Sequence, residues 1–149
     1  MMHWVTLIWL RSGEIFTATV CIWALIRGGL PGRIGSVTML IGWALTNLVS
    51  PVNTGPGPLV VLIDLGMFVS YLGLAIWYRR WWTYFAAACQ LNAVACHFVH
   101  KATTFGIFSY ATSEGFWGGW AVVICLAWGV VDYRRQLKKR TLDAAALGA

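Results

Sequence analysis

The sequence predicts an all-α integral membrane protein, a bundle of five transmembrane helices with its N-terminus outside and its C-terminus inside. Three observations predict this fold class: the composition, the lengths of the apolar stretches and the placement of the basic residues. Of 149 residues, 59% are hydrophobic and 11% are charged, and the mean hydropathy is +0.69. A soluble domain carries about 25% charged residues. The chain is therefore expected to form a single membrane domain and no soluble domain.

The apolar stretches have the length of membrane-spanning helices, which need about 17 to 25 residues. Five such stretches lie at residues 4–26, 34–50, 59–78, 81–100 and 116–133. Gly and Pro residues punctuate the two segments between the first three stretches, RGGLPGR at 27–33 and PVNTGPGP at 51–58, and predict turns there. The pair Arg79-Arg80 predicts a tight hairpin, and residues 101–115 are expected to form a loop.

The basic residues predict the orientation, because cytoplasmic loops carry an excess of Lys and Arg. With five spans, nine of the eleven basic residues fall on one side, and only Arg11 and Lys101 do not. The expected location is therefore the bacterial inner (plasma) membrane, with multiple passes and a basic cytoplasmic tail at 134–149. The net charge of +6 follows this topology, so nucleic acid is not an expected partner. Lipid headgroups, or an acidic cytoplasmic partner, are expected to contact Arg134, Arg135, Lys138, Lys139 and Arg140.

Small residues inside the spans favour helix packing. The four cysteines lie within predicted spans and have no CxxC spacing, so they are interpreted as buried thiols that fill space between helices. Gly115 and Gly119 form a GxxxG motif at the start of the last span. Such a motif predicts close packing within this bundle or a face for a second copy of the chain.

Polar residues inside the spans are the principal candidates for function, because ionisable groups in a bilayer are costly, about 2.5 to 3.5 kcal/mol each. Asp64 lies about 8 Å below the outer end of the third span at 1.5 Å per residue. The alternating directions of the spans place five further polar residues at a similar depth. The predicted cluster on the periplasmic side consists of Arg11, Glu14, Asn47, Asp64, His97 and His100.

The fourth span carries a narrow polar stripe. Thr83, Gln90, His97 and Lys101 recur at intervals of seven, seven and four residues, which places them on one helical face. Three alanines flank the stripe, at positions 86, 87 and 93. Because small and polar residues favour contact with other helices over contact with lipid, we expect this face to point into the bundle.

The polar cluster has three interpretations. In the first, Arg11 pairs with Glu14, Asp64 is protonated or pairs with a histidine, and the network only fixes helix register. In the second, the cluster binds a small ligand or a metal ion, since imidazole and carboxylate groups from separate helices form common metal sites. Haem fits less well, because His97 and His100 lie on one helix and cannot be opposite axial ligands. The third interpretation is a proton or ion pathway, with Gln90 as the step inward.

One segment carries a resemblance to a known group. Arg80-Trp81-Trp82 is followed by Gln90 and His97, ten and seventeen residues after the arginine, and preceded by Asp64 and the Arg-Gly-Gly turn. This RWW…Q…H pattern over residues 25–100 resembles a group of small, uncharacterised multi-span bacterial inner-membrane proteins. The chain departs from the pattern at Thr83, where the group has proline, and at Asn92, where it has an apolar residue. The resemblance implies a multi-span fold and no particular activity.

No motif in the sequence indicates catalysis: it has no nucleophile with a base and no Gly-rich phosphate loop. The leading hypothesis is therefore a non-enzymatic structural or accessory subunit of a larger membrane complex, such as a respiratory or photosynthetic one. The 22 aromatic residues suit protein neighbours in the membrane, including a second copy of the chain. The alternative is a protein that handles a small ligand, a metal, an ion or a proton through the polar cluster, with Asp64 and His97 as the central pair. A lysis pore and a pH sensor are minor variants.

Overall fold

A computed structural model describes residues 2–49, 57–102 and 112–147, and the side-chain surroundings of residues 12–49, 57–99 and 112–146. Within these ranges the chain is all-α, and the predicted fold class is confirmed at that level. The helices are α1 (Met2–Arg27), α2 (Gly29–Val49), α3 (Pro58–Tyr78), α4 (Trp81–Ala102), the π-helical segment η1 (Gly115–Ala121) and α6 (Val122–Leu147).

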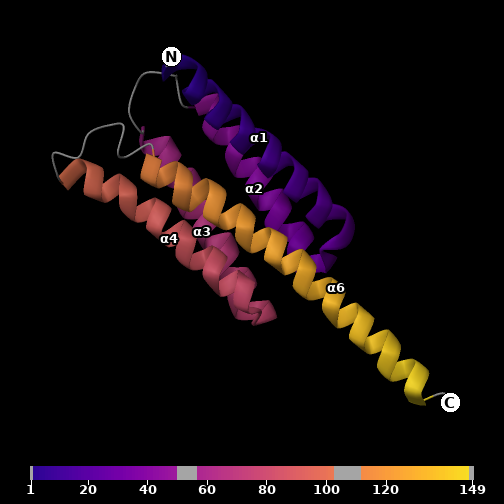
Figure 1. Cartoon of the computed structure of the whole chain (residues 1–149). Coiled ribbons are helices and arrows are strands. Elements are labelled where there is room, and N and C mark those ends of the chain that lie inside the picture. Colours follow the sequence, from indigo (N-terminus) through magenta and orange to yellow (C-terminus); the bar gives the residue numbers. More distant parts are fainter. Residues whose placement is uncertain (1, 50–56, 103–111, 148–149) are drawn as a thin grey trace.

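The helices form a bundle that α6 closes. Each of α1 to α4 packs against the next helix in the chain, and α6 packs against α1, α2 and α4. Figure 1 shows α6 running between the α1–α2 hairpin and the α3–α4 hairpin and then continuing past their ends to the C-terminus. The core between the helices is apolar and is built around Met39, Met67, Tyr71, Trp82 and Leu126.

The turn between α1 and α2 is shorter than the predicted turn at 27–33. α1 ends at Arg27 and α2 begins at Gly29, so Pro31 lies in the first helical turn. A proline is tolerated there, because the amide that it lacks has no partner inside the helix. Gly29 has φ +63°, a left-handed conformation that favours glycine. An added Cβ would also lie 2.7 Å from the ring of Tyr133.

The predicted hairpin at Arg79-Arg80 is confirmed. Arg79 adopts φ 49° and its N–H donates to the Ala75 carbonyl at 3.0 Å, which ends α3. The Arg80 carbonyl then accepts a hydrogen bond of 2.6 Å from the Thr83 hydroxyl in the first turn of α4. The Arg80 side chain lies 3.7 Å from Asp132 on α6. This hairpin brings α3 and α4 side by side and sets the depth at which their polar residues face each other.

The last helix is longer at both ends than the predicted span 116–133. Residues 112–114 are already helical, so the predicted loop at 101–115 is wrong at its end. At the other end the helix continues through the basic residues to Leu147, so the tail predicted at 134–149 is helical over most of its length. Lys, Arg, Gln, Leu and Ala favour helix, and a helix that packing has already nucleated extends through them at little cost.

Within the part of the chain that the structure describes, two helices are long and apolar enough to cross a membrane, by length and composition only. They are Pro58–Tyr78 and Thr112–Ala146. In α2 and α4 the apolar sequence is diluted by glycine, threonine and amide residues, which lowers their hydropathy. The polar stripe predicted on α4 is confirmed where the structure describes it: Thr83, Gln90 and His97 are buried, as are the flanking alanines.

Candidate functional site

Asp64 is a buried carboxylate on the inward face of α3. It shares that face with Met67, Tyr71 and Leu74, which recur at the helical spacing and are also buried. Only 5% of Asp64 is exposed. Burial of a carboxylate in a mainly apolar bundle is costly unless other groups hydrogen-bond to it. The partners of Asp64 therefore define the centre of the site.

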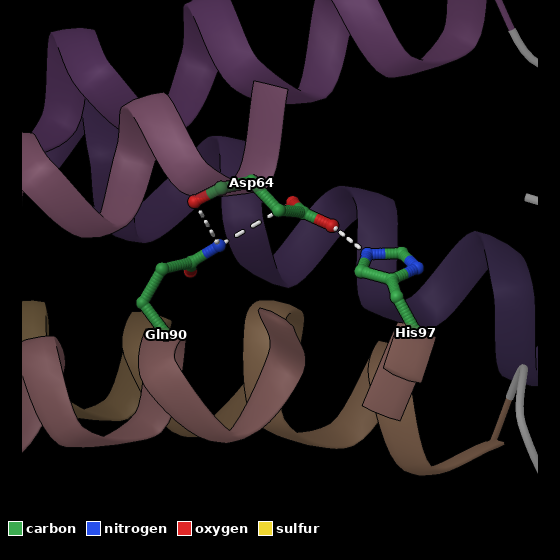
Figure 2. Close-up of polar contacts among 3 residues, drawn as sticks. All are labelled: Asp64, Gln90 and His97. Atoms are coloured by element: carbon green, nitrogen blue, oxygen red, sulfur yellow. Dashed lines mark hydrogen bonds and ion pairs between the residues drawn. The ribbon is translucent and has the colours of Figure 1, made fainter. Parts of the chain in front are cut away.

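Two residues of α4 supply those partners. His97 Nε2 lies 2.6 Å from Asp64 Oδ2, and Gln90 Nε2 donates to Asp64 Oδ1 at 3.3 Å. The same amide lies 3.5 Å from the main-chain carbonyl of Asp64. Figure 2 shows Gln90 and His97 reaching from α4 to the two sides of the carboxylate. Of the two alternatives that the sequence leaves open for Asp64, protonation or pairing with a histidine, the structure shows a contact with a histidine, and that histidine is His97.

Gln90 and His97 hold Asp64 in place, but one polar atom of this arrangement has no hydrogen-bond partner among the described residues. Gln90 and His97 are 0% and 1% exposed, so their contacts with Asp64 are shielded from solvent. The contact of 2.6 Å between His97 Nε2 and Asp64 Oδ2 is short for a hydrogen bond between nitrogen and oxygen. Gln90 Oε1 is buried and accepts no hydrogen bond among the described residues. The Gln90 side chain thus contacts Asp64 through its NH2 group alone.

A cavity of about 330 Å³ lies against Asp64. Its volume is in the range of small-ligand sites, roughly 300 to 1,000 Å³. Glu14 of α1 and Asn47 of α2, both predicted members of the polar cluster, line it together with Asp64. The Asn47 side-chain amide donates to the Trp43 carbonyl of its own helix at 3.0 Å, which leaves its carbonyl oxygen and its second N–H for a ligand. The structure therefore brings three of the predicted residues to one cavity.

Glu114 adds a further carboxylate that the sequence analysis did not include. It lines the cavity just before η1. A Cβ added at Gly118 would lie 3.6 Å from Glu114 Oε1 and 3.1 Å from Ala93 Cβ, which places the carboxylate near the contact between η1 and α4. The available signal was its position at the outer end of the last apolar stretch. The assignment of residues 101–115 to a loop obscured that signal.

The π-helical segment η1 forms one wall of the cavity. π-Helical turns are rare and occur often at functional sites. Gly115 and Gly119 of the GxxxG motif line the cavity, and a Cβ added at either glycine would meet no atom within 4 Å. The predicted use of this motif for packing within the bundle is therefore wrong. Trp120 lines the same wall and stacks on Phe16 of α1, with ring centroids 5.2 Å apart.

The inner side of the cavity is closed by packed side chains. Met39 and Met67 line the cavity and belong to the apolar core. Deeper in the bundle, the Tyr71 hydroxyl donates to the Gly35 carbonyl at 2.9 Å, and the Ser36 hydroxyl donates to the Gly32 carbonyl at 2.8 Å. Both of these buried hydroxyl groups therefore donate their hydrogen to main-chain carbonyls of α2.

The remaining predicted residues lie elsewhere. Arg11 and His100 belong to α1 and α4, but their side chains lie outside the described part of the chain, so the predicted Arg11–Glu14 pair is untested. Among the described residues, no group of three His, Cys, Asp or Glu side chains is placed to hold a metal ion. The basic residues of the C-terminal segment are exposed on α6, far along the chain from the cavity: Arg134, Arg135, Lys138, Lys139 and Arg140.

Comparison of the chain with protein-family models, with curated proteins and with solved structures gives no match. The function of this chain is therefore inferred from its own geometry. The relevant features are the pair formed by Asp64 and His97, the cavity beside it and the carboxylates that line that cavity.

Proposed function

We propose that this chain is a non-enzymatic membrane protein that binds a small organic cation in the cavity beside Asp64. The observation that carries the proposal is the composition of the cavity wall. Glu14, Asp64 and Glu114 line it, and no Lys, Arg or His is among its described lining residues. Carboxylates held in a site of low dielectric constant favour a positively charged ligand more strongly than carboxylates in water do.

The apolar part of the wall supports an organic cation over a metal ion. Trp43, Phe116 and Trp120 line the cavity, and aromatic faces attract quaternary and primary ammonium groups. The stacking of Trp120 on Phe16 restrains that ring before any ligand arrives. Gln90 and His97 of α4 contact the two carboxylate oxygens of Asp64. The carboxylate is therefore already positioned at the cavity and needs no rearrangement on binding.

The proposal includes the membrane topology predicted from the sequence. Five spans, with the N-terminus outside, place the cavity in the outer half of a bacterial inner membrane and the basic end of α6 in the cytoplasm. The cytoplasmic location of the C-terminus is tested by reporter fusions. Alkaline phosphatase fused after residue 149 is expected to be inactive, and a fluorescent protein at the same position is expected to fluoresce. An active phosphatase fusion would contradict the proposed orientation.

A charge substitution tests the binding function. Benzyltrimethylammonium, added to the protein in a neutral detergent at about 100 times its Kd, is expected to raise Tm by about 5 to 10 °C. Glu114→Gln is expected to remove most of this shift. Asp143→Asn, which removes a charge from the exposed end of α6, is the matched control and is expected to keep it. An equal shift in all three proteins would contradict binding at the acidic cavity.

A second proposal is an accessory subunit of a larger membrane complex. The observation that favours it is the C-terminal part of α6, which extends beyond the other helices and exposes five basic residues. An exposed basic surface of this kind attracts an acidic partner. Extraction of the tagged protein from native membranes in mild detergent, followed by measurement of particle mass, tests it. A stoichiometric larger protein would support this function, and a particle made only of this chain would remove it.

A further inference from the structure

A second hollow lies on the lateral surface of the bundle, between α2 and α3. It is an apolar groove of about 600 Å³, lined by the exposed side chains of Ile41, Leu45, Leu59 and Leu62 and by the bare backbone at Gly66. Polar groups are sparse along it. Thr38 is one, and Ser70, at the end nearer the inner side, donates its hydroxyl to the Gly66 carbonyl. The groove therefore offers an elongated apolar surface with no charge.

The groove and the acidic cavity meet at two residues. Gly42 and Met67 line both hollows. Gly42 has no side chain to separate them, and a Cβ added there would overlap the Met67 side chain. The Met67 side chain is thus the partition between the carboxylates and the face of the bundle. Methionine is unbranched and has three rotatable bonds, so it can change rotamer without displacing the helices.

From this continuity we infer that the ligand is a membrane-borne amphiphile with a cationic head and a single alkyl chain. The head occupies the cavity beside Asp64 and Glu114, and the chain passes Met67 and lies in the groove between α2 and α3. The inference rests on the proposed cation binding and adds the ligand class and the route of entry. A charged head matches the acidic cavity, and an apolar chain matches the uncharged groove.

The entry route follows from the same contacts. A head that enters sideways from the membrane does not need to cross the packed inner core formed by Met39, Tyr71 and Leu126. It needs only the displacement of Met67. A chain already dissolved among lipid tails gains little from contact with apolar side chains. The binding free energy should therefore come mainly from the cationic head, and the shape of the groove should determine which alkyl chains can be accommodated.

Two glycines of α3 provide a matched test. Gly66 lines the groove and Gly73 does not, and a Cβ at either position would meet no atom within 4 Å. The protein is placed in phosphatidylcholine nanodiscs, and binding of dodecyltrimethylammonium, benzyltrimethylammonium and dodecanol is measured. We expect Gly66→Leu to weaken dodecyltrimethylammonium binding at least tenfold and to leave benzyltrimethylammonium binding unchanged. Gly73→Leu is expected to change neither, and dodecanol is expected not to compete.

The outcomes separate this inference from the proposed function. If Gly66→Leu and wild type bind dodecyltrimethylammonium equally, or if dodecanol competes with it, the groove does not select a tailed cation and the inference is overturned. Cation binding that Glu114→Gln abolishes would then still support the proposed function. If neither cation binds the wild-type protein, both proposals fail together.

Discussion

Asp64 and His97 are joined across the α3–α4 interface by a contact of 2.6 Å between Oδ2 and Nε2, with both residues almost fully buried. Removal of one member leaves the other without its main partner in a mostly apolar environment. Loss of one partner of a buried pair costs about 3 to 5 kcal/mol. The pair therefore links the stability of the bundle to the position of the carboxylate at the cavity.

A double-mutant cycle should reveal this link. We expect His97→Ala to lower the free energy of unfolding by about 3 kcal/mol, because Asp64 stays buried and keeps only its weaker contact with Gln90. Asp64→Asn combined with His97→Ala should cost clearly less than the sum of the two single changes. Unfolding in mixed micelles of increasing denaturing detergent provides the measurement. Additive costs would show that the two side chains are not energetically coupled.

The partition between cavity and groove predicts a second effect. Gly42→Ala places a methyl group on the Met67 side chain and should destabilise the bundle by about 1 to 3 kcal/mol, as overpacking does. Met67→Ala alone also destabilises the bundle, because it removes a buried side chain, but the double variant Gly42→Ala with Met67→Ala should cost less than the sum of the two single changes. The melting temperatures of the three variants test this. Equal melting temperatures for wild type and Gly42→Ala would mean that Met67 does not lie against Gly42.

The turn between α1 and α2 requires glycine at position 29 for two independent reasons. Its φ is +63°, and the ring of Tyr133 occupies the space next to its Cα. We expect Gly29→Ala to lower stability by about 1 to 2 kcal/mol from the backbone conformation alone. In the Gly29→Ala protein, the further change Tyr133→Ala should remove the steric clash with the ring but leave the cost of the left-handed backbone conformation. A Gly29→Ala protein as stable as wild type would contradict both the left-handed turn and the ring contact.

The ion pair at the inner end should contribute little. Arg80 and Asp132 lie 3.7 Å apart, and their side chains are 39% and 37% exposed. Exposed pairs of this kind contribute about 0 to 1 kcal/mol. Arg80→Gln should therefore shift the melting temperature far less than His97→Ala does. A larger loss from Arg80→Gln would mean that the α3–α4 hairpin depends on this contact with α6.

The sequence predicted the centre of the site because periodicity carries that information. The spacing of Thr83, Gln90 and His97 places them on one face of a helix, and small neighbours indicate that this face packs inward. The short hairpin at Arg79-Arg80 then fixes the register between α3 and α4. Asp64 and His97 meet because of the helical spacing and the short hairpin, and both of these features can be recognised in the sequence.

Other features depend on tertiary packing and were not predictable in this way. Glu114 falls in the loop that the sequence predicts at 101–115, whereas in the structure η1 packs against α4 and the helix already includes residue 112. Gly115 and Gly119 fit a packing motif, yet the π-helical geometry of that segment turns them to the cavity. Periodicity calculated for a regular α-helix cannot anticipate that change of pitch.

Binding of a small cation in the cavity is tested most directly by a steric block. Gly119 lines the cavity and has open space at its Cβ position, so Gly119→Leu should fill the site without displacing a neighbour. Isothermal titration with benzyltrimethylammonium is expected to give one site per chain in wild type and in the control Gly73→Leu. Gly119→Leu should weaken binding at least tenfold. Equal affinity in the three proteins, or no binding to wild type, would contradict a cation site beside Asp64.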